Sequence, residues 1–286
     1  MRGNLKQQNP CLVLIETHQL ENQESQEYVV CELDELDVTS SKGTSYGKRI
    51  VKIKGIPSED LVAKIKNGEI ISGETSMMAQ DSELTEDSIV ISKDKPPRFE
   101  KKNGSGEGRK LTSAIGKKRV LVVRVKALDA STTQSKATLS DEIFGTGGDS
   151  FNLKTGYEHC SRQQFLIEPS NDPRVTDLNQ RSTEAGVFEV TIPNNVVGVA
   201  NGFIRDAVRS ALDTQLGSDW KTSFDLTMLC LPPGTNGSWV AYAYVNHYLS
   251  VYNDKWCSYP SAGMHEIGHN INLAHSGEGS AGRMLI

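Results

Sequence analysis

The sequence lacks any apolar run of the ~18 residues that a membrane-spanning helix requires, so no membrane span is expected. The apolar residues 10–15 are too few for a signal peptide and carry no small-residue cleavage site. Positive charge is not in excess either: the net charge is −5 at pH 7, which argues against nucleic acid as a partner. With 37% hydrophobic and 23% charged residues in 286, the composition is that of a globular protein with a buried core.

The cysteines also lack the CxxC spacing of a zinc knuckle. Among the last three of them, one disulfide in an oxidising compartment is as compatible with the sequence as buried free thiols. Because the count is odd, at least one thiol within the chain stays free. The five are Cys11, Cys31, Cys160, Cys230 and Cys257.

Three histidines and one glutamate gather near the C-terminus. Residues 265–269 read HExxH, and a third histidine follows six residues after the second. At about 100° per residue, His265 and His269 share one helix face and can bind one metal ion, with Glu266 beside it. His275 supplies the third ligand if the chain reverses after the helix, and Asn272 tolerates the positive φ that ends a helix. Three imidazoles predict an open, catalytic Zn²⁺ site.

This pattern is specific. With six histidines and 36 acidic residues in the chain, chance would produce it in about 3 of 10,000 such sequences. Glu278 is an alternative third ligand, but it follows the helix too soon to return from a second helix. The competing interpretation of the stretch is an amphipathic core helix with solvated histidines. Its apolar residues would be Met264, Ile267, Ile271 and Leu273.

The same stretch resembles the metzincin metalloproteases, and within them the gametolysin family of algal and diatom zinc endopeptidases. Besides HExxHxxxxxH, the resemblance rests on residues 239–245 (Trp-Val-Ala-Tyr-Ala-Tyr-Val) and 249–257 (Leu-Ser-Val-Tyr-Asn-Asp-Lys-Trp-Cys). Residues 144–154, which begin Phe-Gly-Thr-Gly-Gly-Asp, are also similar. The resemblance covers about residues 119–280. It departs from the usual pattern at Asn272, where most metzincins have glycine.

The resemblance implies a zinc-dependent endopeptidase acting on protein substrates such as extracellular-matrix or cell-wall glycoproteins. His265, His269 and His275 would hold Zn²⁺, and Glu266 would be the general base. An extracellular or cell-wall location is implied as well, although no signal peptide is evident in this chain. The sequence gives no indication of the oligomeric state.

Metzincins also have a methionine-containing turn downstream of the third histidine. Here Met284 is followed only by Leu285 and Ile286, so the catalytic domain is expected to lack its C-terminal part. An alternative function follows from this: a catalytically inactive remnant that binds a metal or regulates a protease.

The domain organisation expected is a β-rich domain at residues 1–92, a flexible linker at 93–118 and a metallopeptidase domain at 119–286. The linker is rich in lysine, glycine and serine, which cannot bury a core. A β domain ahead of a protease suggests a pro-segment, in which Cys31 is a candidate latency ligand for the zinc. His18 lies in a polar context and is expected to be exposed. Strands are expected in this domain at 11–16, 28–33, 49–53, 69–71 and 88–91.

The catalytic part alternates strands and helices, which predicts an α+β fold. Residues 120–125 form a central strand, because they are almost continuously apolar. Residues 200–216 form an amphipathic helix. Residues 239–245 form the edge strand, where a peptide substrate usually adds as a further strand. The zinc-binding helix is expected at 263–271.

Overall fold

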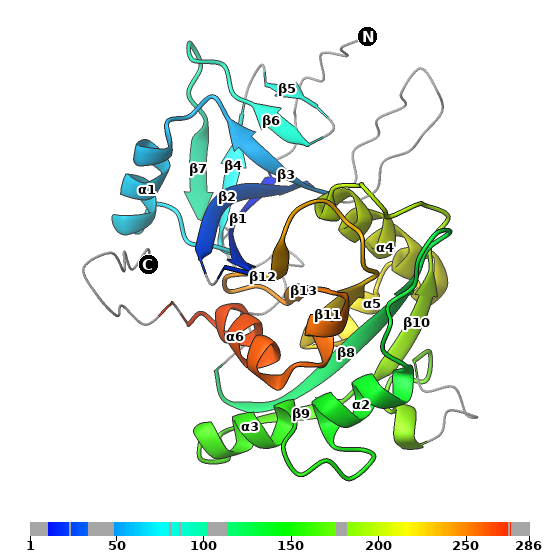
Figure 1. The fold of residues 1–286 in the computed structure, drawn as a ribbon. Helices are drawn as coiled ribbons and strands as arrows, with labels where there is room; N and C mark the ends of the chain where they lie inside the picture. The colour runs from blue at the N-terminus through cyan, green and yellow to red at the C-terminus, as the bar shows by residue number, and fades with distance from the viewer. Residues whose placement is uncertain are drawn as a thin grey trace. The chain divides into compact units, whose positions relative to one another are not determined.

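A computed structural model shows the fold (Figure 1). Among the residues that the structure describes, no helix is long and apolar enough to cross a membrane. Contacts divide the chain into two compact units, the first of residues 1–16, 27–110 and 273–286 and the second of 17–26 and 111–272. The structure describes residues 11–22, 24–33, 49–79, 82–85, 87–101, 114–175, 182–273 and 275.

Within its described residues the first unit is rich in β-structure and contains the helix α1 (Ser58–Lys66). Its strands follow the order β1-β2-β3-β6-β5, and β4 pairs with β1 and with β7. A disulfide joins Cys11 and Cys31, on β1 and β2. The strands are β1 (Cys11–Leu20), β2 (Ser25–Leu33), β3 (Arg49–Lys54), β4 (Thr75–Met78), β5 (Glu83–Leu84), β6 (Ser88–Val90) and β7 (Arg98–Lys101).

Two segments of this unit differ from expectation. Residues 69–71 are not a strand: the N–H groups of Glu69 and Ile70 donate to the carbonyl of Lys64 and close the end of α1. Backbone donors used to end a helix are not available to a sheet. The strand that follows is β4 instead. Strand β7 falls in the range expected to be a linker, and it pairs with β4.

The second unit is built on a mixed sheet of order β10-β8-β11-β13-β12. Neighbouring strands are parallel except β12, which is antiparallel to β13. Strand β8 is central, as predicted, and β9 and β10 pair with its first and second halves. The strands are β8 (Gly116–Lys126), β9 (Phe165–Pro169), β10 (Val187–Thr191), β11 (Leu226–Leu231), β12 (Trp239–Tyr244) and β13 (Leu249–Asn253).

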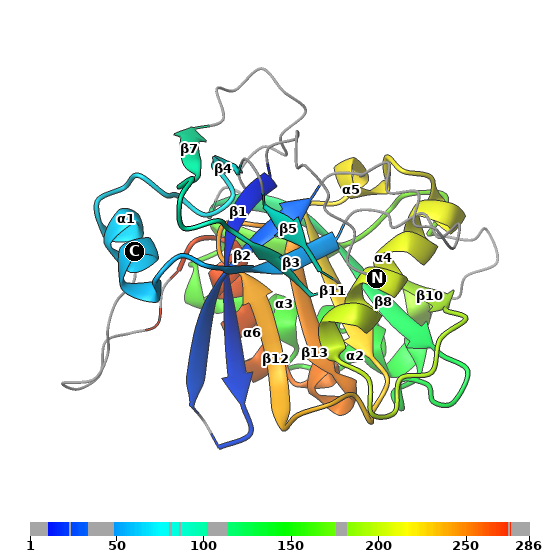
Figure 2. The same cartoon turned by 90° about the horizontal axis from the view of Figure 1, so that it is seen from above.

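Helices cover both faces of this sheet (Figures 1 and 2). The amphipathic helix α4 packs on β10 and β11, whereas α2, α3 and α6 share a hydrophobic core with the opposite face. That core includes Val120 and Val122 of β8, whose alternation points them to the same side. The helical segments are α2 (Lys136–Phe144), α3 (Leu153–Cys160), η1 (Ser182–Glu184), α4 (Asn201–Leu216), α5 (Trp220–Ser223), η2 (Asp254–Ser258) and α6 (Pro260–Asn270).

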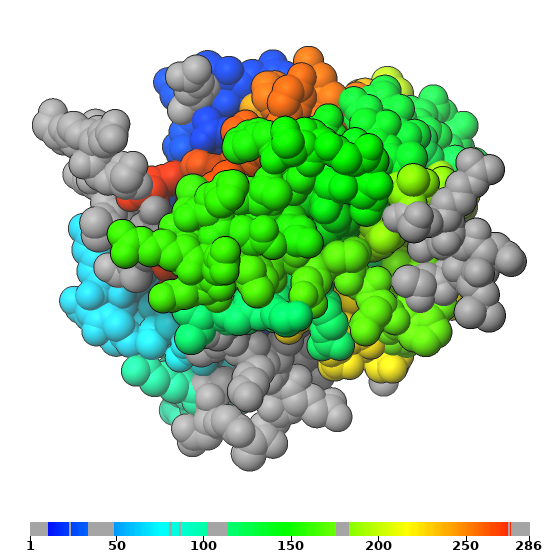
Figure 3. Space-filling model, turned by 90° about the horizontal axis from the view of Figure 1, so that it is seen from below, coloured from blue at the N-terminus to red at the C-terminus, as the bar shows by residue number. Residues whose placement is uncertain are grey.

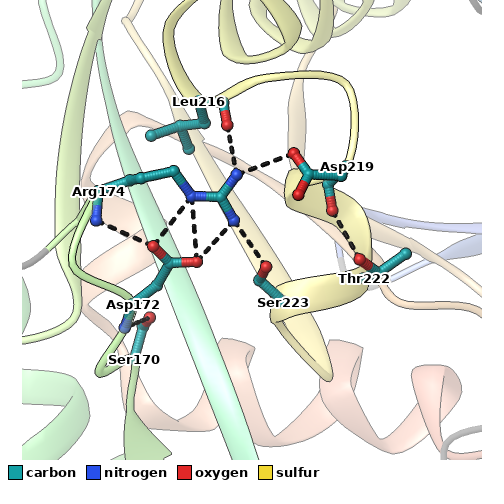
Figure 4. A network of polar contacts seen from close by, with 7 residues as sticks. All are labelled: Ser170, Asp172, Arg174, Leu216, Asp219, Thr222 and Ser223. Atoms are coloured by element: carbon teal, nitrogen blue, oxygen red, sulfur yellow. Dashed lines mark hydrogen bonds and ion pairs between the residues drawn. The ribbon is translucent and has the colours of Figure 1, made fainter.

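An arginine network ties the end of α4 to α5 and to the loop after β9 (Figure 4). The guanidinium of Arg174 donates to both carboxylate oxygens of Asp172, at 3.0 and 2.7 Å, and to Asp219 at 2.9 Å. It also donates to Ser223 and to the carbonyl of Leu216. These hydrogen bonds lower the pKa of Asp172 to about 2.

The tip of the β1–β2 hairpin, Thr17–Gln26, belongs to the second unit. His18 is half-buried rather than exposed, which corrects the expectation from its polar sequence context. Its ring stacks on Tyr242 of β12, with centroids 4.4 Å apart and planes 5° apart. The neighbours of His18 in the chain are polar, but its neighbour in space is an aromatic ring.

Candidate metal and catalytic site

Helix α6 contains the HExxH motif of residues 265–269. It begins with proline at the first helical position, which has no backbone N–H to leave unpaired. It therefore starts three residues before the expected 263 and ends at Asn270. Asn272 has φ of 70°, the left-handed conformation that allows a reversal, and its N–H donates to the carbonyl of His269 at 2.9 Å.

The structure brings the three predicted histidines together. One ring nitrogen from each of His265, His269 and His275 lies within 4.8 Å of the others. The Nε2 atoms of His265 and His269 are 3.2 Å apart. Ring nitrogens this close suit a shared cation, and three imidazoles are a donor set that transition metals prefer. Among the described residues, no second group of histidine, cysteine or acidic side chains is placed to hold a metal.

Glu266 follows the first histidine and is only 1% exposed. Burial raises the pKa of its carboxyl well above the ordinary value. Its Oε2 atom has no hydrogen-bond partner among the described residues. A buried carboxyl oxygen left in this way calls for a further polar partner at the site. Burial raises the pKa values of Tyr157 and Tyr252. The nearby charge of an ionised Glu266 raises both pKa values further.

Helix α3 packs against α6. The hydroxyl of Tyr157 donates to the carbonyl of Met264 at 2.7 Å. Two glycines let the helices approach: a Cβ at Gly156 would lie 2.8 Å from Met264 Sδ, and one at Gly263 would lie 3.0 Å from Leu153. Figure 3 shows α2 and α3 in green, beside the orange and red of η2 and α6. The metal-site helix is therefore packed closely against a fixed neighbour.

Asn270 anchors the other side of α6, and sequence reasoning missed it. Its amide nitrogen donates to the carbonyl of Tyr244 at 3.1 Å and to that of Leu249 at 2.9 Å. The N–H of Asn246 donates to the carbonyl of His269 at 3.0 Å. The helix end is thus held against the end of β12 and the start of β13. The available signal was an asparagine inside a helix, where it has poor propensity unless its side chain has a partner.

Two histidines outside the HExxH stretch, His159 and His247, do not join the group that could hold a metal. His159 is exposed on α3, whereas His247 is buried between Tyr244 and Tyr248, with ring centroids 5.6 and 4.3 Å away. Glu278 and Met284 lie outside the described residues.

The disulfides remove one sequence hypothesis. Cys31 is bonded to Cys11, so it has no free thiol to act as a latency ligand. Its partner lies 20 residues away on the adjacent strand, a pairing that spacing alone does not indicate. Of the remaining three, Cys230 and Cys257 form a disulfide and Cys160 is free and exposed, so one of the two interpretations left open is confirmed.

HExxH on a helix, a third histidine and a buried glutamate are together the side-chain set of a metallopeptidase. The sequence model of the gametolysin peptidase M11 family matches residues 118–282, more than half of the chain. The chain belongs to this peptidase family, as its sequence motifs predicted. No curated protein and no solved structure gives a significant match to the chain.

Proposed function

We propose that the chain is a zinc-dependent endopeptidase of metzincin type, which cleaves internal peptide bonds of proteins. The observation that carries this proposal is the convergence of His265, His269 and His275 beside the buried Glu266. The three imidazoles would hold Zn²⁺ and leave a position open. The mixed sheet, the amphipathic α4 and the motif on α6 fit the fold that the resemblance implies.

Each side chain has a separate task in this proposal. Zinc held by the three imidazoles would supply Lewis-acid polarisation of the scissile carbonyl and would make the attacking water more acidic. Glu266 accepts the proton of that water and gives it to the leaving amine. Asn270 and Tyr157 do not touch the substrate; they hold α6 in position.

The substrate class and the location are part of the proposal. We infer extracellular-matrix or cell-wall glycoproteins as substrates, and an extracellular or cell-wall location. The two disulfides support an oxidising compartment. The β-rich part at residues 1–92 would be a pro-segment.

The experiment measures zinc content and hydrolysis of fluorescein-labelled casein. We expect one zinc per chain. The change Glu266→Gln should keep the zinc and lower the turnover rate roughly 10²–10⁴-fold, which is the usual worth of a general base. His275→Ala should weaken zinc binding by more than roughly 10–100-fold, which is the usual effect of losing a residue that only hydrogen-bonds to a metal ligand. His159→Ala, an exposed histidine on α3, is the matched control and should change neither quantity.

Hydrolysis that persists in Glu266→Gln would contradict the assignment of the base. Zinc content that is unchanged in His275→Ala would contradict the third ligand. A chain that binds zinc but hydrolyses nothing would favour an inactive metal-binding remnant.

A further inference from the structure

Strand β12 is the last strand of the second unit's own sheet. Strand β13 pairs with one side of β12. The other side is occupied by the hairpin tip, residues 17–26, which the contacts assign to the same unit (Figure 2). The N–H of Glu21 donates to the carbonyl of Ser238 at 3.5 Å, just before β12 begins. His18 stacks on Tyr242 in the middle of β12.

These two contacts fix the direction of the tip. His18 contacts Tyr242, and the later residue Glu21 contacts the earlier residue Ser238, so residue numbers rise along the tip and fall along β12. The tip therefore runs antiparallel to β12, as an added strand can. The ring of His18 also extends a row of aromatic contacts along β12: Tyr242 lies 5.5 Å from Trp239 and 5.9 Å from Tyr244, between ring centroids.

The occupied edge leads directly to the metal site. Strand β12 ends at Tyr244, whose carbonyl accepts a hydrogen bond from Asn270 of α6. Two residues later, Asn246 donates to the carbonyl of His269, a metal-site residue. An extended peptide that paired with the outer side of β12 in place of the tip would run along the sheet edge towards the histidines. Addition to a sheet edge is a common way to bind an extended peptide.

We propose that the hairpin tip is an intramolecular competitor for the substrate strand. It occupies the outer side of β12, and a protein substrate must displace it before its own backbone can pair there. The proposal rests on the peptidase function proposed above. It assigns an inhibitory task to residues 17–26 that does not depend on a cysteine ligand, which the Cys11–Cys31 disulfide rules out for Cys31.

The apparent affinity for substrate then depends on how often the tip is displaced. An affinity measured on a partly blocked protein is weakened by the fraction of molecules that are open. An aromatic pair such as His18 and Tyr242 contributes about 1 kcal/mol, so removing it should raise the open fraction about fivefold. Casein affinity should rise by the same factor.

The experiment measures binding without turnover. In the Glu266→Ala background, binding of fluorescein-labelled casein is followed by fluorescence polarisation. We expect His18→Ala to bind about fivefold more tightly than the unchanged chain. Glu21→Pro, which removes the N–H that donates to Ser238, should also bind more tightly. Glu24→Ala, an exposed residue of the same tip, is the matched control and should leave the affinity unchanged.

Hydrogen exchange supplies a second measurement on the same variants. Amide protons of residues 239–244 should exchange faster in His18→Ala and Glu21→Pro than in Glu24→Ala. Faster exchange with unchanged casein affinity would show that the tip covers β12 but does not compete with substrate, which overturns the proposal. Unchanged exchange and affinity in both variants would overturn it as well.

The two proposals can fail separately. If casein hydrolysis depends on Glu266 while casein affinity ignores the tip, the competitor proposal alone is wrong. If the tip variants bind casein more tightly but no zinc-loaded variant with Glu266 restored hydrolyses it, the peptidase proposal alone is wrong.

Discussion

Replacing Asn270 by alanine should loosen the metal-site helix from the sheet. The residue is fully buried, and its amide nitrogen holds the carbonyls of Tyr244 and Leu249. Two hydrogen bonds contribute about 1 kcal/mol each, and the two carbonyls lose a donor in a buried place. We expect Asn270→Ala to lower the free energy of unfolding by about 2–4 kcal/mol. Asn270→Asp should cost more, because a carboxylate would face two carbonyl oxygens.

The assay is urea unfolding followed by tryptophan fluorescence, with a chelator present so that metal binding does not mask the loss. Asn272→Gly is the matched control. Asn272 is exposed and has a positive φ, which glycine adopts readily, so the free energy of unfolding of this variant should change little. Casein hydrolysis by zinc-loaded Asn270→Ala should fall by more than the fraction unfolded, because α6 shifts. A stability loss below about 0.5 kcal/mol, the range of neutral surface changes, would refute this account of Asn270.

Two further changes test contacts within the second unit, one in the arginine network and one beside the metal-site helix. In Asp172→Asn, the ion pair with Arg174 is lost, and stability at neutral pH should fall by about 1–2 kcal/mol. Since the folded pKa of Asp172 is lowered to about 2, that contribution is present above about pH 4 and disappears as the pH falls towards 2. Acid titration of unfolding should therefore show a smaller pH dependence in the variant, and an unchanged curve would contradict the ion pair. Gly156→Val should push α3 away from Met264 and weaken zinc binding, whereas zinc affinity equal to that of the unchanged chain would contradict the close helix contact.

Local patterns in the sequence were enough for much of the site. The four-residue step from His265 to His269 places both rings on one face of any helix, so their proximity needed no tertiary information. Asn272 could be identified because few residues tolerate positive φ. The continuous apolar run of β8 indicated a strand buried on both faces.

Features that depend on distant neighbours were out of reach. His18 has polar neighbours in the sequence, and its burial comes from Tyr242, more than two hundred residues later. Residues 69–71 have strand-like composition, but the end of α1 takes their N–H groups. Asn270 anchors α6 to carbonyls at the end of β12 and the start of β13, which no periodicity of the sequence relates to it. Cysteine spacing likewise does not reveal that Cys11 pairs with Cys31.

The free thiol at Cys160 has a practical consequence. Four of the five cysteines are bonded in pairs, so a thiol-reactive dye or spin label would modify this single exposed position. Cys160 ends α3, the helix that packs against α6 and donates from Tyr157 to its backbone. A label there would lie on the support of the histidine site without any engineered substitution. Its spectrum would test whether metal binding or displacement of the hairpin tip changes the surroundings of α3.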